Sequence, residues 1–122
     1  MEGALAGRLA VVTGASRGLG AEIADTLARS GARIALVARG SRSLAAVARH
    51  IVDEGGVCRA FPADVSQVEA VESMAADVQR ELGEPDILVN AAGVFGPLRP
   101  IVEKEGDTYL AVVKDFVRRA SA

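Results

Sequence analysis

Short apolar runs alternate with longer amphipathic stretches through most of the chain. Four runs rich in Ala, Val, Leu and Ile predict strands at residues 9–13, 33–39, 57–65 and 86–90. Between them, apolar residues recur at a helical spacing and predict helices at about residues 18–30, 41–55 and 67–82. The positions expected to face the sheet are Ile23, Ala24, Leu27 and Ala28 in the first helix, Leu44, Val47, Ala48 and Ile51 in the second, and Val68, Val71, Met74, Ala75 and Val78 in the third.

Turn-forming and capping residues separate these elements. Gly40–Ser41 predicts a turn and a cap for the second helix, and Asp64 or Ser66 is expected to cap the third. Residues 94–106 contain two prolines and two glycines and predict a loop. A last helix is expected over residues 108–120.

Strands that alternate with helices through short loops form right-handed β-α-β units around a parallel sheet. The sequence therefore predicts the α/β class: a Rossmann-like three-layer α/β/α sandwich with a four-stranded parallel sheet in the order 3-2-1-4. We expect residues 1–122 to form a single minimal domain of this kind. The fourth strand would lie at an edge of the sheet, where an uncovered apolar strand favours pairing, so self-association into a homo-oligomer is predicted.

Composition excludes several classes of function. Half of the 122 residues are hydrophobic and the formal net charge is −2, so neither a nucleic-acid groove nor a membrane-binding patch is expected. Cys58 is the only cysteine, which excludes an intramolecular disulfide and suits a reducing cytoplasm, and we interpret it as a small core residue. His50, the only histidine, is interpreted as a solvated helix residue, so no metal site is predicted. Neither a signal peptide nor a membrane-spanning run is expected.

The stretch from Thr13 to Gly20 joins the first strand to the first helix and contains three glycines. Glycines let the backbone turn sharply and approach a ligand closely, and the following helix offers unpaired N–H groups at the positive end of its dipole. Together these features predict a site for a phosphate or a pyrophosphate. The alternative is a tight loop that binds no ligand.

Four features in the right order favour the first interpretation. The turn has the pattern Thr-Gly-x-x-x-Gly-x-Gly, Arg39 ends the second strand, Asp64-Val65 follows the third strand, and Asn90-Ala91-Ala92-Gly93 follows the fourth. With this set, residues 7 to about 100 resemble the first, cofactor-binding half of a short-chain dehydrogenase/reductase.

The resemblance implies a role for each matching position. The residues that would hold the pyrophosphate and the adjoining ribose are Gly14, Ser16, Gly18, Leu19 and Gly20. Those that would contact the adenine ring are Asp64 and Val65. Those that would line the ribose near the switch point of the sheet are Asn90, Ala91, Ala92 and Gly93. For Asn90 a second role stays equally open, in which its side chain ties neighbouring strands together.

The end of the second strand favours NADP(H) over NAD(H) as the cofactor. An NAD site has an acidic residue there to accept from the ribose 2′-hydroxyl, whereas Ala38 and Arg39 occupy this end and no Asp or Glu follows before Asp53. A guanidinium can hold a 2′-phosphate through two hydrogen bonds. Arg17 is a second candidate cation and Arg42 a weaker third. The alternative is that all three are solvated surface arginines.

The catalytic residues that the resemblance implies have no match in the chain. The family pairs a tyrosine with a lysine four residues later, but the only tyrosine, Tyr109, has Val113 at that spacing and Lys114 one residue further on. A separation of five residues rotates a lysine away from the tyrosine on a helix, so we interpret Tyr109 as packing the last helix onto the sheet. No catalytic residue is assigned, and the resemblance is predicted to end before the family's catalytic half.

Three functions follow from this sequence. The leading one is an NADP(H)-binding module without competent reductase chemistry. The second is an oxidoreductase for NADPH-dependent carbonyl reduction, completed by another chain. The third is a truncated or engineered scaffold without significant ligand binding.

Overall fold

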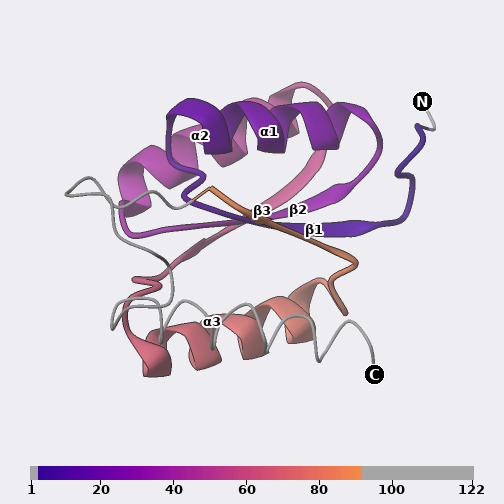
Figure 1. The fold of residues 1–122 in the computed structure, drawn as a ribbon. Coiled ribbons are helices and arrows are strands. Elements are labelled where there is room, and N and C mark those ends of the chain that lie inside the picture. The colour runs from indigo at the N-terminus through magenta and orange to yellow at the C-terminus, as the bar shows by residue number, and fades with distance from the viewer. Residues whose placement is uncertain (1–2, 92–122) are drawn as a thin grey trace.

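The computed structural model describes residues 3–91 of the chain. Strands and helices alternate within them without exception (Figure 1). Their bounds are β1 (Leu9–Thr13), α1 (Gly18–Arg29), β2 (Arg33–Ala38), α2 (Ser41–Asp53), β3 (Val57–Pro62), α3 (Val68–Glu81) and β4 (Ile87–Asn90). Each predicted element up to residue 90 is therefore present.

The four strands form one parallel sheet in the order β3-β2-β1-β4. Helices α1 and α2 cover one face of this sheet and α3 covers the other (Figure 1). The predicted Rossmann-like three-layer sandwich and its strand order are thus confirmed. The chain adds β2 and β3 on one side of β1 and then crosses to the other side of β1 to add β4. Because all four strands are parallel, their carboxyl ends lie at one edge of the sheet.

Successive side chains of the two central strands point to opposite faces, which divides the core into two clusters. The cluster under α3 contains Leu9 and Val11 of β1 together with Val37 of β2, and the cluster under α1 and α2 contains Val12 and Leu36. All five side chains are fully buried. Because β1 and β2 are covered on both faces, they consist of nearly unbroken apolar sequence.

The start of α3 differs from the prediction. Strand β3 ends at Pro62 rather than at residue 65, and neither Asp64 nor Ser66 caps the helix, whose N-cap is Gln67 without a side-chain hydrogen bond. Instead, Asp64 Oδ1 accepts hydrogen bonds from the Ser66 amide at 2.9 Å and the Ser66 hydroxyl at 2.6 Å. Val68, predicted to face the sheet, is 42% exposed, and the buried side chains of α3 begin at Val71.

The start predicted for α2 at Gly40–Ser41 is confirmed, but the cap has no side-chain hydrogen bond. The N-cap is Gly40, which has no side chain to accept a hydrogen bond, and Ser41 is already the first residue of the helix. The position of the turn was predicted correctly, because glycine ends the preceding segment, but the serine hydroxyl caps nothing.

Cys58 and His50 lie in the surroundings expected of them. Cys58 is partly buried against the core, and its burial raises the pKa of the thiol to about 12, so the thiol stays protonated at neutral pH. This confirms a packing role. The side chain of His50 is 57% exposed, and its Nε2 lies 3.7 Å from carboxylate oxygens of Asp25 and Glu54. Residues 3–91 contain no group of His, Cys, Asp and Glu suited to a metal ion.

Strand β4 lies at an edge of the sheet and pairs only with β1 among the described strands. Pairing of a second chain with this edge stays a prediction. Within residues 3–91 no helix is long and apolar enough to span a membrane. The predicted loop at 94–106, the predicted last helix with Tyr109, and the candidate residues Ala92 and Gly93 lie outside the described residues.

Candidate functional site

The turn between β1 and α1 forms the centre of the candidate site. Gly14 and Gly18 have positive φ values of 66° and 59°, a left-handed conformation that favours glycine. Between them, Ala15 is fully buried, and its N–H donates to the Val37 carbonyl at 3.2 Å. The middle of the turn is therefore bonded to β2 near the carboxyl end of that strand. The two left-handed glycines, Gly14 and Gly18, reverse the direction of the chain on either side of Ala15.

The second and third glycines of the turn have different steric surroundings. A Cβ on Gly20 would lie 2.2 Å from the Gly14 carbonyl oxygen, so only glycine lets the first turn of α1 pack directly on the loop. A Cβ on Gly18 would meet nothing within 4 Å. The packing of α1 on the turn therefore leaves no room for a side chain at Gly20, whereas the space beside Gly18 is empty of protein atoms.

The start of α1 has the electrostatics of an anion site. Its N-cap residue, Arg17, is extended with φ −168° and makes no side-chain capping hydrogen bond, and the first turn contains no acidic residue. The N–H groups that begin a helix have no partners within it, and they carry the positive end of its dipole. A phosphate beside Gly18 would receive these donors without competition from a side chain of the first turn.

The base of the turn is joined to β4. The hydroxyl of Thr13, only 1% exposed, donates to Asn90 Oδ1 at 2.7 Å, and the Ala91 N–H donates to the Thr13 carbonyl at 3.2 Å. The structure therefore shows the strand-tying arrangement for Asn90. The same bonds place Asn90 and Ala91 beside the start of the glycine turn.

Arg39 and Asp64 meet at the ends of β2 and β3. Arg39 follows β2 directly, its side chain is 78% exposed, and its Nη1 lies 4.0 Å from Asp64 Oδ2. The hydrogen bonds from the hydroxyl and amide of Ser66, and more weakly the charge of Arg39, hold the pKa of the Asp64 carboxyl below its ordinary value. Val65, the neighbouring candidate, is partly buried and packs against the core under α3 rather than standing free.

A family model described as short chain dehydrogenase matches residues 8–114. The chain belongs to the short chain dehydrogenase family. The 2,3-dihydro-2,3-dihydroxybenzoate dehydrogenase of Bacillus subtilis is 38% identical to it over 117 residues, which cover 94% of this chain and 45% of that protein. The D-threitol dehydrogenase of Mycolicibacterium smegmatis is 39% identical over 110 residues, covering 88% and 42%. The chain therefore spans less than half the length of these two curated relatives.

Solved structures of the family share the fold. A metagenomic short-chain oxidoreductase in complex with NADP has a TM-score of 0.81 at 38% identity, covering 94% of this chain and 57% of that one. L-Sorbose reductase from Gluconobacter frateurii, complexed with NADPH and L-sorbose, has a TM-score of 0.79 at 32% identity, covering 98% and 48%.

Most of the predicted site residues of this member of the short chain dehydrogenase family gather at one edge of the sheet. The residues at or after the carboxyl ends of the four strands there are Gly14, Ser16, Gly18, Gly20, Arg39, Asp64, Asn90 and Ala91. Leu19 and Arg17 are exposed on the outer side of the turn, Leu19 to 69%. Arg42, the weakest cation candidate, is exposed in the first turn of α2.

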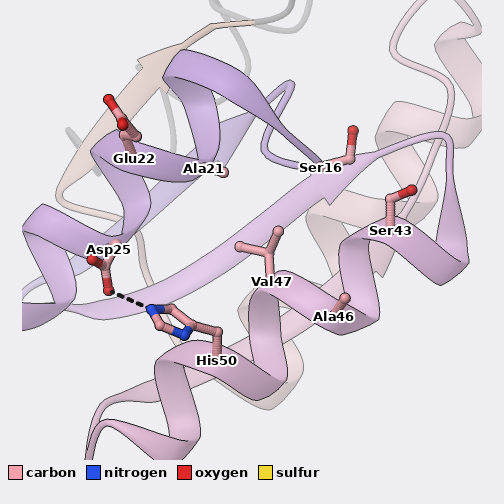
Figure 2. A pocket seen from close by; sticks show the side chains of 8 residues that line it. All are labelled: Ser16, Ala21, Glu22, Asp25, Ser43, Ala46, Val47 and His50. Carbon is pink, nitrogen blue, oxygen red and sulfur yellow. Dashed lines mark ion pairs between the residues drawn. The ribbon is translucent and has the colours of Figure 1, made fainter.

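Sequence reasoning missed a groove between α1 and α2. It has a volume of about 530 Å³ and begins beside the glycine turn at Ser16 (Figure 2). The other residues that line it are Ala21, Glu22, Asp25, Ser43, Ala46, Val47 and His50. The two alanines leave the space between the helices, and the ion pair of Asp25 with His50 crosses it (Figure 2).

Proposed function

We propose that this chain binds NADP(H), with the diphosphate of the cofactor at the start of α1. The observation that carries the proposal is the open glycine turn, in which Gly18 is left-handed and a Cβ on it would meet nothing within 4 Å. A diphosphate can therefore approach the backbone closely and accept from the first N–H groups of α1. Arg17 at the N-cap adds a positive charge, and no carboxylate in the first turn opposes it.

The end of β2 supports NADP(H) over NAD(H). The exposed guanidinium of Arg39 follows this strand, and neither β2 nor the turn into α2 contains an acidic residue. A phosphate on the ribose carries about −1.5 to −2 charges and forms charge-assisted bonds with such a group. The complexes of two related structures, with NADP and with NADPH, also support this preference.

The described residues serve to bind and orient rather than to react. A bound nicotinamide donates or accepts a hydride, and the proton that accompanies it needs a titrating group within hydrogen-bond reach. Residues 3–91 contain no tyrosine, and Tyr109 lacks a lysine at the spacing that the family pairs with it. We therefore infer that the chain holds its cofactor without reducing a carbonyl by itself.

The relatives favour a second candidate function. Those compared above are dehydrogenases, and this chain spans 45% and 42% of their lengths. The similarity to these dehydrogenases supports an oxidoreductase for NADPH-dependent carbonyl reduction, completed by another chain. Assays of carbonyl reduction with NADPH test both candidates: sustained turnover by this chain alone contradicts our inference, whereas turnover that appears only when a second chain is added supports the completed oxidoreductase.

Replacing Gly18 with alanine tests the proposed binding directly. We expect the Kd for NADPH, measured by fluorescence titration, to rise at least about tenfold, because the new methyl group occupies the space the diphosphate needs. The left-handed backbone at Gly18 also costs the variant about 1 kcal/mol of folding free energy.

The matched control is Gly7→Ala. Gly7 is also left-handed, with φ +81° and nothing within 4 Å of a Cβ, but it precedes β1 at the opposite edge of the sheet. It should lose similar stability and keep the wild-type Kd. Equal binding by both variants would contradict the placement of the diphosphate. The absence of a saturable signal from the wild-type chain up to millimolar NADPH would favour a scaffold that binds nothing.

A further inference from the structure

The guanidinium of Arg39 has a carboxylate beside it. Its Nη1 lies 4.0 Å from Asp64 Oδ2, across the gap between the ends of β2 and β3. Within the described part of the chain, the other two candidate cations, Arg17 and Arg42, make no ion pair. Of the three arginines that could meet a 2′-phosphate, Arg39 is thus the one whose charge is already partly compensated.

The carboxylate is more firmly held than the guanidinium. Asp64 Oδ1 accepts from both the amide and the hydroxyl of Ser66, at 2.9 and 2.6 Å, which leaves Oδ2 as the oxygen nearest Arg39. The side chain of Asp64 is 34% exposed and that of Arg39 is 78% exposed. Arg39 can therefore turn toward a ligand, while Asp64 keeps its negative charge next to the place where that ligand is held.

We propose that Asp64 lowers the preference of this site for NADP(H) over NAD(H). Its carboxylate competes with the 2′-phosphate for the Arg39 guanidinium and also repels that phosphate. The inference rests on the proposed function and adds a specificity-determining residue to it. NAD(H) has a hydroxyl in place of the phosphate, so it does not experience this repulsion. Contacts of Asp64 with the adenosine portion common to both cofactors change both affinities alike and cancel in their ratio.

The effect is moderate because the pair is exposed to solvent. At a dielectric close to that of water, and after screening by salt, repulsion between a carboxylate and a phosphate on one guanidinium changes affinity by about three- to tenfold. The repulsion weakens as the ionic strength rises, which distinguishes it from a change in packing.

The experiment compares the Kd values of NADPH and NADH for the wild-type chain, Asp64→Asn and the control Ser66→Ala. Asparagine keeps an oxygen that can accept from Ser66 but removes the charge. We expect Asp64→Asn to raise the ratio of NADH Kd to NADPH Kd by about three- to tenfold at low salt and by less at 0.5 M salt. Ser66→Ala keeps the charge and should leave the ratio within about twofold.

In a double-mutant cycle with Arg39→Ala, the Asp64→Asn change should raise the ratio less than it does in the wild-type background, because only the direct repulsion of the phosphate then remains. An unchanged or lower ratio in Asp64→Asn would overturn the inference while leaving the proposed function intact. A rise that is the same at both salt concentrations, or in Ser66→Ala, would also overturn it. Failure of the wild-type chain to bind either cofactor would overturn the proposed function and this inference with it.

Discussion

Gly20→Ala is expected to destabilise the fold by about 3 kcal/mol, near the upper end for overpacking a tight contact. The added Cβ would lie 2.2 Å from the carbonyl oxygen and 2.8 Å from the carbonyl carbon of Gly14, and 3.2 Å from the Cα of Ala15. All three atoms belong to the backbone, so no side-chain rotation relieves the contact. Either α1 must lift from the sheet or the turn must lose its hydrogen bond to β2.

Thermal unfolding followed by circular dichroism measures this effect. For a domain of this size, a loss of about 3 kcal/mol corresponds to a fall in Tm of about 12 °C or more. Gly40→Ala is the control, because Gly40 is not left-handed and the nearest atom to its Cβ would be Ser43 Oγ at 3.8 Å. Its Tm should stay within about 3 °C of the wild type. A Gly20→Ala chain that unfolds as late as this control would show that the turn is looser than the structure indicates.

Arg39→Asp is expected to weaken NADPH binding by about 100-fold while changing NADH binding by no more than about threefold. The substitution removes a charge-assisted bond to the 2′-phosphate and places a carboxylate near it, beside Asp64. With NADH, the new carboxylate meets a ribose hydroxyl, which can donate to it. The quantity to compare is the ratio of the two Kd values in each protein.

Arg49→Asp provides a control of the same charge change. The Arg49 side chain is 85% exposed and its Nε lies 4.0 Å from Asp53 Oδ2, which closely matches the exposure and ion-pair distance of Arg39. It lies in the second half of α2, away from the carboxyl ends of the strands. Equal losses of NADPH affinity in the two variants would mean that only net charge matters and would remove the case for a 2′-phosphate contact at Arg39.

The fold could be predicted from the sequence because its signals are local and repeated. The apolar run at β1, the glycine turn, the amphipathic α1 and the apolar run at β2 define one β-α-β unit, and the right-handedness of such units limits the strand orders that are possible. The end of β3 was harder to place, since Ala63 and Val65 remain apolar after the strand has ended at Pro62. Their side chains pack against the core from the loop rather than from the sheet.

The sequence does not predict which charged and polar side chains of the site lie next to one another. The sequence predicts Arg39 as a phosphate ligand and Asp64 as an adenine ligand, but their pairing depends on the register that sets Ala38 beside Pro62. The hydrogen bonds of Ser66 to Asp64 are not evident from the sequence either, because a serine near a helix start is expected to cap that helix. The groove between α1 and α2 is lined by residues of both helices, and the periodicity within one helix does not predict the space between two.

Binding of a diphosphate by the backbone amides at the start of α1 can be observed residue by residue. The experiment is a titration of the isotopically labelled chain with NADPH, followed by ¹⁵N–¹H NMR of the backbone amides. We predict saturable shifts that are largest for Ser16, Gly18 and Gly20 and extend to Arg39. Shifts confined to Val47 and His50 in the groove between the helices, or no saturable shift at the glycine turn up to millimolar NADPH, would show that the diphosphate does not bind at the start of α1.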